Sequence, residues 1–188
     1  LKSGYKMPSL YQRYAPYAGN ANLLIEESET KELTLSKQYK NIKLSGTLFE
    51  SNITNEIAYS NTTYSYFNNN SDYSGNEYSI ELRDLAYLTF LKLNYTTFNS
   101  DVSKVPDYKG SLSAGVKLNK WRAGLFIYSF GETTLPGYSY TDMSLHYDYS
   151  SAGNFYLTVH NAFNKEYETV ENYTEAGRTL YLGLKRNF

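Results

Sequence analysis

The sequence contains no cysteine among its 188 residues, and only 2 methionines and 1 tryptophan. Without cysteine the chain has no disulfide scaffold, no zinc–thiolate site and no thiol chemistry. The 18 basic and 19 acidic side chains nearly cancel, so no excess of positive charge points to nucleic acid. No stretch approaches the roughly 18 consecutive apolar residues of a transmembrane helix. These absences exclude several protein classes, but they leave a membrane-spanning β-barrel open.

Aromatic residues are unusually abundant, with 22 tyrosines and 9 phenylalanines. The mean hydropathy is nevertheless −0.56, which is hydrophilic. Tyrosine combines an apolar ring with a polar end, and such side chains collect at membrane–water boundaries. The composition therefore indicates a protein whose apolar surface meets a lipid–water interface.

Apolar and polar residues alternate with a period of two along most of the chain, the pattern of a β-strand with two different faces. In 109–119 one face carries only apolar residues, namely Leu112, Ala114, Val116 and Leu118. The opposite face carries Lys109, Ser111, Ser113 and Lys117. The same alternation occurs in 33–39, 42–48, 77–83, 87–97, 121–129, 142–149, 155–161 and 179–188. The pattern predicts about nine strands, many of them long enough for a tilted transmembrane strand, which needs about nine to eleven residues.

The connections between these segments fall into two classes that alternate along the chain. Short links are predicted at 40–41, 84–86, 119–120 and 150–153, and long links at 15–28, 52–72, 99–107, 130–137 and 164–176. Up-and-down outer-membrane barrels have tight turns at one end and long loops at the other. The sequence therefore predicts an all-β fold, an antiparallel up-and-down transmembrane β-barrel.

Both ends of the chain resemble TonB-dependent outer-membrane receptors. Near the C-terminus, a predicted strand ends in an Asn-x-x-Asn-Lys-x-Tyr run, followed by a loop and a Gly-Arg pair; the residues are Asn161, Asn164, Lys165, Tyr167, Gly177 and Arg178. Near the N-terminus, 6–37 resembles the family's Pro-containing turn, Gly-Asn-x-x-Leu loop and Glu-Ser strand entry. The residue types suggest that Asn161 and Asn164 form hydrogen bonds within a turn and that Gly177 allows the backbone conformation there.

The final strand resembles the signal by which outer-membrane barrels are recognised during assembly. Gly183 lies five residues before the end, and apolar side chains such as Leu184 occupy alternate positions up to Phe188, except at Arg186. The resemblance implies that the barrel assembly machinery is a partner of this strand.

The resemblance also implies a larger protein. Residues 1–188 would be the C-terminal portion of a barrel of about 22 strands, with the N-terminal plug and the earlier strands outside this sequence. The complete receptor would lie in the bacterial outer membrane, in contact with lipid and lipopolysaccharide. It would work with the TonB system through the plug and would need no cofactor.

The family resemblance implies import of a scarce, bulky nutrient, either cobalamin or an iron-siderophore. Rigid amphipathic rings in the long loops suit such ligands, because they offer contact area at low ordering cost. The candidate ligand-binding residues are Tyr11, Tyr14, Tyr17, Tyr64, Tyr66, Phe67, Tyr138 and Tyr173. Some of these rings could instead belong to the aromatic girdle of a barrel.

No metal site and no catalytic group is predicted. His146 and His160 lie on polar strand faces without a third ligand in register, and the loop acids from Glu166 to Glu175 lack an ordered calcium-binding spacing. No Ser/His/Asp arrangement and no phosphate-binding glycine loop is recognisable, so the sequence does not predict an enzyme. A passive pore or adhesive barrel, a barrel enzyme and a soluble β-sandwich or solenoid remain alternatives.

Overall fold

The computed structural model describes residues 1–100 and 105–186. It contains one short helix, α1 (Leu10–Tyr14), and twelve strands. The strands are β1 (Lys2–Lys6), β2 (Glu26–Tyr39), β3 (Ile42–Ser60), β4 (Ser65–Leu85), β5 (Leu88–Ser100), β6 (Tyr108–Leu118), β7 (Trp121–Phe130), β8 (Tyr138–Ser150), β9 (Gly153–His160), β10 (Glu168–Val170), β11 (Tyr173–Thr174) and β12 (Thr179–Arg186). Among the described residues, no helix has the length and apolar character needed to cross a membrane.

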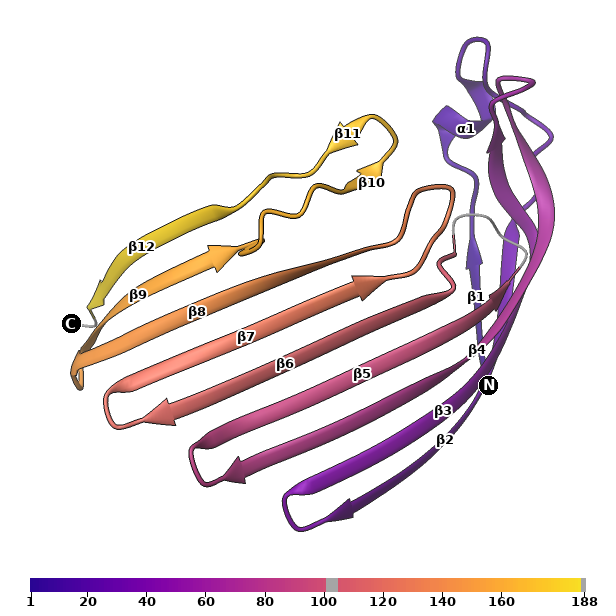
Figure 1. Cartoon of the computed structure of the whole chain (residues 1–188). Helices are drawn as coiled ribbons and strands as arrows, with labels where there is room; N and C mark the ends of the chain where they lie inside the picture. Colours follow the sequence, from indigo (N-terminus) through magenta and orange to yellow (C-terminus); the bar gives the residue numbers. More distant parts are fainter. Residues whose placement is uncertain (101–104, 187–188) are drawn as a thin grey trace. The chain divides into compact units, whose positions relative to one another are not determined.

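Ten of the strands form one sheet in the order β1-β2-β3-β4-β5-β6-β7-β8-β9-β12. The order follows the chain, apart from the small β10–β11 hairpin inserted before β12 (Figure 1). The order begins with β1 and ends with β12, so the described part of the chain forms an open sheet. This confirms the predicted antiparallel up-and-down arrangement. The nine predicted strands correspond to β2–β9 and β12, whereas β1 and the β10–β11 hairpin were not predicted.

The chain divides into two compact units. Unit 1 comprises 1–33, 48–75 and 99–102, and unit 2 comprises 34–47, 76–98 and 103–188. Leu23 and Ile57, both in unit 1, are the only buried hydrophobic side chains among the described residues. The described residues therefore form no conventional dry core.

The predicted long loop at 52–72 is wrong, because most of it belongs to a hairpin. β3 continues to Ser60 and β4 begins at Ser65, so that only 61–64 form the turn. Residues rich in Asn, Ser and Thr resemble a loop in sequence, yet here asparagine side chains bond neighbouring strands. Asn68 Nδ2 donates to the Asn55 carbonyl at 2.7 Å, and Asn70 Oδ1 accepts from the Asn55 amide at 3.0 Å. These bonds support the backbone at Asn55, which has a φ of 57°.

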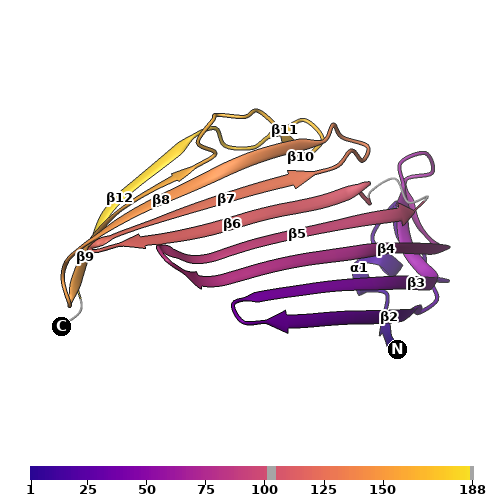
Figure 2. The same ribbon diagram turned by 60° about the horizontal axis from the view of Figure 1, so that its bottom comes forward.

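In unit 2 the four short turns lie at the same edge, as predicted (Figures 1 and 2). The register between strands aligns the alternating pattern into rows. One row crosses six strands and contains only apolar residues: Leu91, Ala114, Leu125, Met143, Val159 and Leu180. The next row on the same side contains Val116, Ala123, Leu145, Leu157 and Leu182. We call this side the apolar face, and it confirms the predicted face of 109–119.

The opposite side, the polar face, carries charged, hydroxyl and glycine residues in register. One row contains Lys117, Arg122, His146, Tyr156 and Gly183. Another contains Gly115, Gly124, Ser144, Thr158 and Tyr181. Since side chains alternate strictly between faces, a shift of one residue in any pairing would mix the two sides.

Aromatic rings border the apolar face at both ends of the strands. Tyr95 stacks on Tyr108 at 5.8 Å near the long-loop end, and Trp121 contacts Tyr147 at 4.7 Å near the short turns. β6, with 11 residues, connects these two levels. Its rise of about 3.3 Å per residue corresponds to about 25 Å of height at a tilt of about 40°. That is the height of the apolar band in outer-membrane barrels.

A charge on the apolar face should be far more costly than the same charge on the polar face. Ala114→Arg places a guanidinium in the middle of the apolar rows and should cost about 2–4 kcal/mol in a bilayer. Ser144→Arg, a similar increase in size on the polar face, should cost less than about 1 kcal/mol because the charge remains hydrated. Denaturant midpoints of the complete protein in lipid vesicles would measure both. Equal losses for the two variants would refute the assignment of the faces.

Candidate functional site

Within unit 1 the segment before β2 is hydrogen-bonded to the β3–β4 hairpin. Ser9 and Gln12 form a capping box at the start of α1, in which the Gln12 amide donates to Ser9 Oγ at 3.1 Å. The chain then bonds β4: the Tyr66 amide donates to the Ala18 carbonyl at 3.1 Å. Asn20 Nδ2 in turn donates to the Tyr66 carbonyl at 3.0 Å. These bonds hold the aromatic residues of α1 close to those of the hairpin.

Three tyrosines meet where α1 contacts the hairpin. The Tyr66 ring lies edge-on to Tyr11 at 6.4 Å and to Tyr59 at 5.1 Å. Tyr11 is 67% exposed and Tyr59 is 44% exposed, so the rings support one another and still present surface to a ligand. We call Tyr11, Tyr59 and Tyr66 the tyrosine trio.

The other predicted rings of unit 1 lie apart from the trio. Tyr14 ends α1, Tyr17 and Tyr64 occupy turns with positive φ, and Phe67 lies on β4. Tyr66 and Phe67 are therefore strand residues, although the sequence predicts a loop at these positions. Within the described ranges, none of Tyr14, Tyr17, Tyr64 and Phe67 forms a ring pair.

Unit 2 contains a larger group of rings on the polar face, at the long-loop end of β7 and β8. Cross-strand pairs stack Tyr128 on Tyr140 and Phe130 on Tyr138, each at 5.0 Å. Tyr167, from the segment after β9, lies against Tyr138 at 4.4 Å and against Tyr140 at 5.4 Å with an interplanar angle of 4°. We call these five residues the aromatic stack.

The aromatic stack holds the segment that contains Tyr167 against the sheet. The Tyr167 carbonyl accepts a bond from the Glu175 amide at 2.9 Å, which closes the base of the β10–β11 hairpin. Burial, and then the negative charge of Glu175, raises the pKa of the Tyr167 phenol. Like an unperturbed tyrosine, this phenol is neutral at physiological pH and can donate a hydrogen bond.

Asn161 and Asn164 make the turn that the sequence predicts. Asn161 is only 4% exposed. Its Nδ2 donates to the carbonyls of Lys165 at 2.8 Å and Ala176 at 3.2 Å, and its Oδ1 accepts from the Lys165 amide at 2.8 Å. Asn164 Oδ1 accepts from the Arg178 amide at 2.8 Å. The two asparagines thus join both ends of the loop 161–178.

This turn requires glycine at 177 because of a close contact and not because of a positive φ. No described glycine has a positive φ. A Cβ at Gly177 would lie 2.6 Å from Asn164 Oδ1, so a larger residue would displace the side chain that bonds Arg178. Arg178 and Lys165 have exposed side chains.

The remaining predicted residues lie away from both aromatic groups. Tyr173 is on β11, is 73% exposed and is not part of the aromatic stack. In β12, Leu184 belongs to the apolar face opposite Phe155, and a Cβ at Gly183 would overlap the Tyr156 ring. Phe188 lies outside the described residues. The role of Gly183, Leu184 and Phe188 in barrel assembly stays a prediction.

Sequence reasoning missed four members of the aromatic stack as ligand candidates: Tyr128, Phe130, Tyr140 and Tyr167, the last of which was named only as part of the family motif. The alternating pattern of the sequence already places 128 and 130 on one face of β7, and 138 and 140 on one face of β8. Only the pairing of β7 with β8 shows that the two pairs face each other. Within the described ranges no group of three or more His, Cys, Asp or Glu residues could hold a metal ion.

Residues 2–162 match the family model described as "TonB dependent receptor-like, beta-barrel". The chain belongs to this family. Family members are transport receptors of the outer membrane of Gram-negative bacteria, and the outer membrane is the location of this chain as well. The recognition of this family from the sequence is thereby confirmed.

Individual relatives agree with the family. The chain is 28% identical over 205 aligned residues to the vitamin B12 transporter BtuB of Vibrio cholerae serotype O1, covering 99% of this chain and 34% of that protein. The chain therefore spans about a third of the length of the curated relatives it matches.

Solved structures show the same fold. The copper transporter OprC superposes with a TM-score of 0.81 at 12% identity, covering 99% of this chain and 35% of that one. The ferric enterobactin receptor PfeA of Pseudomonas aeruginosa superposes with a TM-score of 0.77 at 19% identity, covering 99% and 37%. The siderophore receptor PirA of Pseudomonas aeruginosa gives 0.74 at 21% identity, covering 99% and 35%. At these identities the superpositions establish the fold alone.

Loss of the Asn161 side chain should loosen the loop 161–178. Asn161→Ala removes three part-buried side-chain hydrogen bonds, at about 0.5–1.5 kcal/mol each. Asn172→Ala is the matched control, because Asn172 also has a positive φ and is exposed. Hydrogen–deuterium exchange should become faster throughout 161–178 in Asn161→Ala and remain unchanged near 161 in Asn172→Ala. If both variants exchanged alike, backbone strain and not the side-chain bonds would explain the effect.

Proposed function

We propose that residues 1–188 are the C-terminal strands and loops of an outer-membrane receptor that binds a scarce, bulky metal chelate and imports it with energy from the TonB system. Family membership supports the receptor role. The plug and the earlier strands of the barrel would lie in the rest of the protein. Import is then a property of the complete receptor, to which this part contributes wall and ligand-binding surface.

The observation that carries the ligand-binding role is the placement of aromatic side chains. The tyrosine trio gathers rings from α1, β3 and β4, and the aromatic stack gathers rings from β7, β8 and the loop after β9. Rings held in this way lose little entropy on binding and offer both apolar faces and hydroxyl groups. Such surfaces suit a large chelate that is partly apolar and partly polar.

Cobalamin is the first ligand to test, and iron-siderophores are the second. Curated relatives at 28% identity are vitamin B12 transporters of Vibrio cholerae. The siderophore receptors share the fold at lower identity. Both ligand classes combine apolar and polar groups, as the two aromatic surfaces do.

Uptake by the complete receptor should depend on metabolic energy. In a host that lacks its own cobalamin and siderophore receptors, the receptor should restore uptake of labelled cyanocobalamin or of a ferric siderophore. Uptake should stop when TonB is deleted, while binding at the cell surface persists. Uptake that continues without TonB would identify a passive pore and overturn the proposal.

Removal of two trio rings should weaken ligand binding. The double variant Tyr11→Ala with Tyr66→Ala should lower the affinity of the purified complete receptor by roughly 5–30-fold, as expected for aromatic residues in an interface. Tyr39→Ala with Tyr87→Ala is the control, because it removes two exposed tyrosines near the short turns. Calorimetric titration with the transported chelate would measure both. Unchanged affinity in the first variant would exclude the trio from the binding site.

A further inference from the structure

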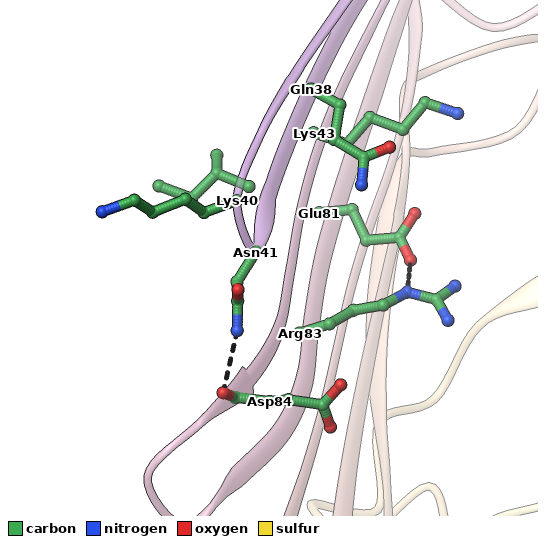
Figure 3. A pocket seen from close by; sticks show the side chains of 8 residues that line it. Gln38, Lys40, Asn41, Lys43, Glu81, Arg83 and Asp84 are labelled. Atoms are coloured by element: carbon green, nitrogen blue, oxygen red, sulfur yellow. Dashed lines mark hydrogen bonds and ion pairs between the residues drawn. The ribbon is translucent and has the colours of Figure 1, made fainter.

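Two-residue turns fix the register of four strand pairs. The β2–β3, β4–β5, β6–β7 and β8–β9 connections each consist of two residues, and in a hairpin the length of the turn sets the register. The β2–β3 turn also binds the next strand. Asn41 Nδ2 donates to the Asp84 carbonyl at 2.9 Å (Figure 3), and the Arg83 amide donates to the Asn41 carbonyl at 2.9 Å. This short turn therefore aligns its own two strands with β4.

Other strand pairs of unit 2 are joined by long segments. β5 connects to β6 through 101–107, β7 to β8 through 131–137, and β9 to β12 through 161–178. A shift of one residue in these pairs would exchange the two faces, but a shift of two residues would not. After a two-residue shift the leucines of β12 would still lie on the apolar face. The alternating pattern therefore leaves the register of these pairs open in steps of two residues.

In two of these pairs an aromatic ring occupies the space above a glycine on the opposite strand. Tyr156 lies directly opposite Gly183, and Phe90 lies directly opposite Gly115. A Cβ at Gly183 would lie 2.7 Å from Tyr156 Cε1 and closer still to Cζ and Oη. A Cβ at Gly115 would lie 2.9 Å from Phe90 Cδ1 and closer still to Cε1. We call Tyr156–Gly183 and Phe90–Gly115 the ring–glycine pairs.

The ring–glycine pairs require space and not an unusual backbone conformation. Both lie on the polar face, and neither glycine has a positive φ. On its other side Tyr156 faces His146, which lies opposite it on β8 with the two ring centres 6.1 Å apart. The Tyr156 ring thus occupies the row between His146 and Gly183, and the glycine provides the room for its outer end.

A two-residue shift would place a side chain where each ring lies. In β9–β12 the shift brings Tyr181 or Lys185 opposite the tyrosine ring, and both carry the Cβ for which the ring leaves no room. In β5–β6 it brings Ser113 or Lys117 opposite Phe90. The ring would have to leave the strand surface in every shifted register, so these registers are less stable than the native one.

We propose that the ring–glycine pairs select the register of strands that long segments join, where no short turn does so. A shift of two residues would move β12 by about 6–7 Å along β9, away from the position at which Asn164 bonds the Arg178 amide. The stagger of the strands also sets the tilt and diameter of a barrel. The pairs therefore act on the wall of the receptor, independently of the transported ligand.

The first experiment tests whether the Tyr156 ring requires glycine opposite it. In the complete receptor in lipid vesicles, Gly183→Ala should raise the unfolding equilibrium constant roughly 5–30-fold, as expected for an overfilled position. In a chain with Tyr156→Ala, the same change should alter the constant by less than about 2-fold, because the ring is gone. Gly110→Ala is the matched control, since its Cβ would lie 3.7 Å from the nearest atom, Tyr95 Cδ2, and should have little effect.

The second experiment measures the register by disulfide cross-linking, for which residues 1–188 offer a background free of cysteine. Thr158→Cys with Tyr181→Cys places the two thiols directly opposite each other in the native register. Thr158→Cys with Thr179→Cys brings them opposite only after a two-residue shift, because diagonal neighbours lie beyond disulfide reach. Tyr156→Ala should increase the second cross-link roughly 5–30-fold, by removing the penalty on the shifted register. His146→Ala, in a pair joined by a two-residue turn, should leave both cross-links unchanged.

An exchanged pair provides the decisive variant if Tyr156→Ala does not fold. Opposite positions of an antiparallel pair are related by a local two-fold axis, so Tyr156→Gly with Gly183→Tyr should fold and give only the native cross-link. Failure of this variant to fold would overturn the proposal. Native cross-links alone in Tyr156→Ala would also overturn it, because the bonds of Asn161 and Asn164 would then suffice to place β12. An equal effect of Gly183→Ala with and without the ring would do the same.

Discussion

The sheet depends on one constraint: in hydrocarbon, backbone amides and carbonyls find no water, so they must bond to a neighbouring strand. Each strand of unit 2 therefore pairs along nearly its whole length, from Leu88–Ser100 to Thr179–Arg186. Pairing sets the register, and the register places Ala114, Leu125 and Met143 in one row. The same register gathers apolar side chains on one exposed face of the sheet, and few of the described ones are buried.

The two ends of the strands in unit 2 carry different chemistry on the same framework. At the long-loop end, rings of β7 and β8 stack with Tyr167 on the polar face. At the short-turn end, lysines are next to aromatic residues in the sequence: Lys40 follows Tyr39, and Lys120 precedes Trp121. Long loops have room for side chains that bind a soluble ligand, whereas two-residue turns do not. This division is compatible with a receptor that binds its ligand on one side of the membrane.

Asparagine has a structural function in both units. Asn68 and Asn70 bond the backbone around Asn55 in unit 1, and Asn161 closes the loop 161–178 in unit 2. An amide side chain can replace a missing backbone partner, because it offers both a donor and an acceptor. This substitution explains why 52–72 folds as strands although its composition is typical of loops. It also explains why Asn164 and Gly177 occur together, since the amide occupies the space that a larger residue would need.

Local chemistry was sufficient to predict most of the strands. The prediction for 109–119 agrees with β6 to within one residue, and the short turn at 119–120 is confirmed, because alternation and turn residues act over a few neighbouring positions. β1 was missed because Lys2–Lys6 has no alternating pattern and is held by its pairing with β2. The β10–β11 hairpin is only a few residues long, which is too short for a periodic signal.

The sequence by itself determined the fold class, the two faces of most strands and the Asn161–Asn164 turn, since each depends on contacts between residues close in the chain. Only the tertiary structure decided that β3 and β4 extend through 52–72, that Tyr167 reaches Tyr138 and Tyr140, and that Lys117 lies opposite Arg122. These features depend on which strands pair and in which register. Pairing is a property of the whole sheet, because the backbone bonds of one strand are completed only by the next.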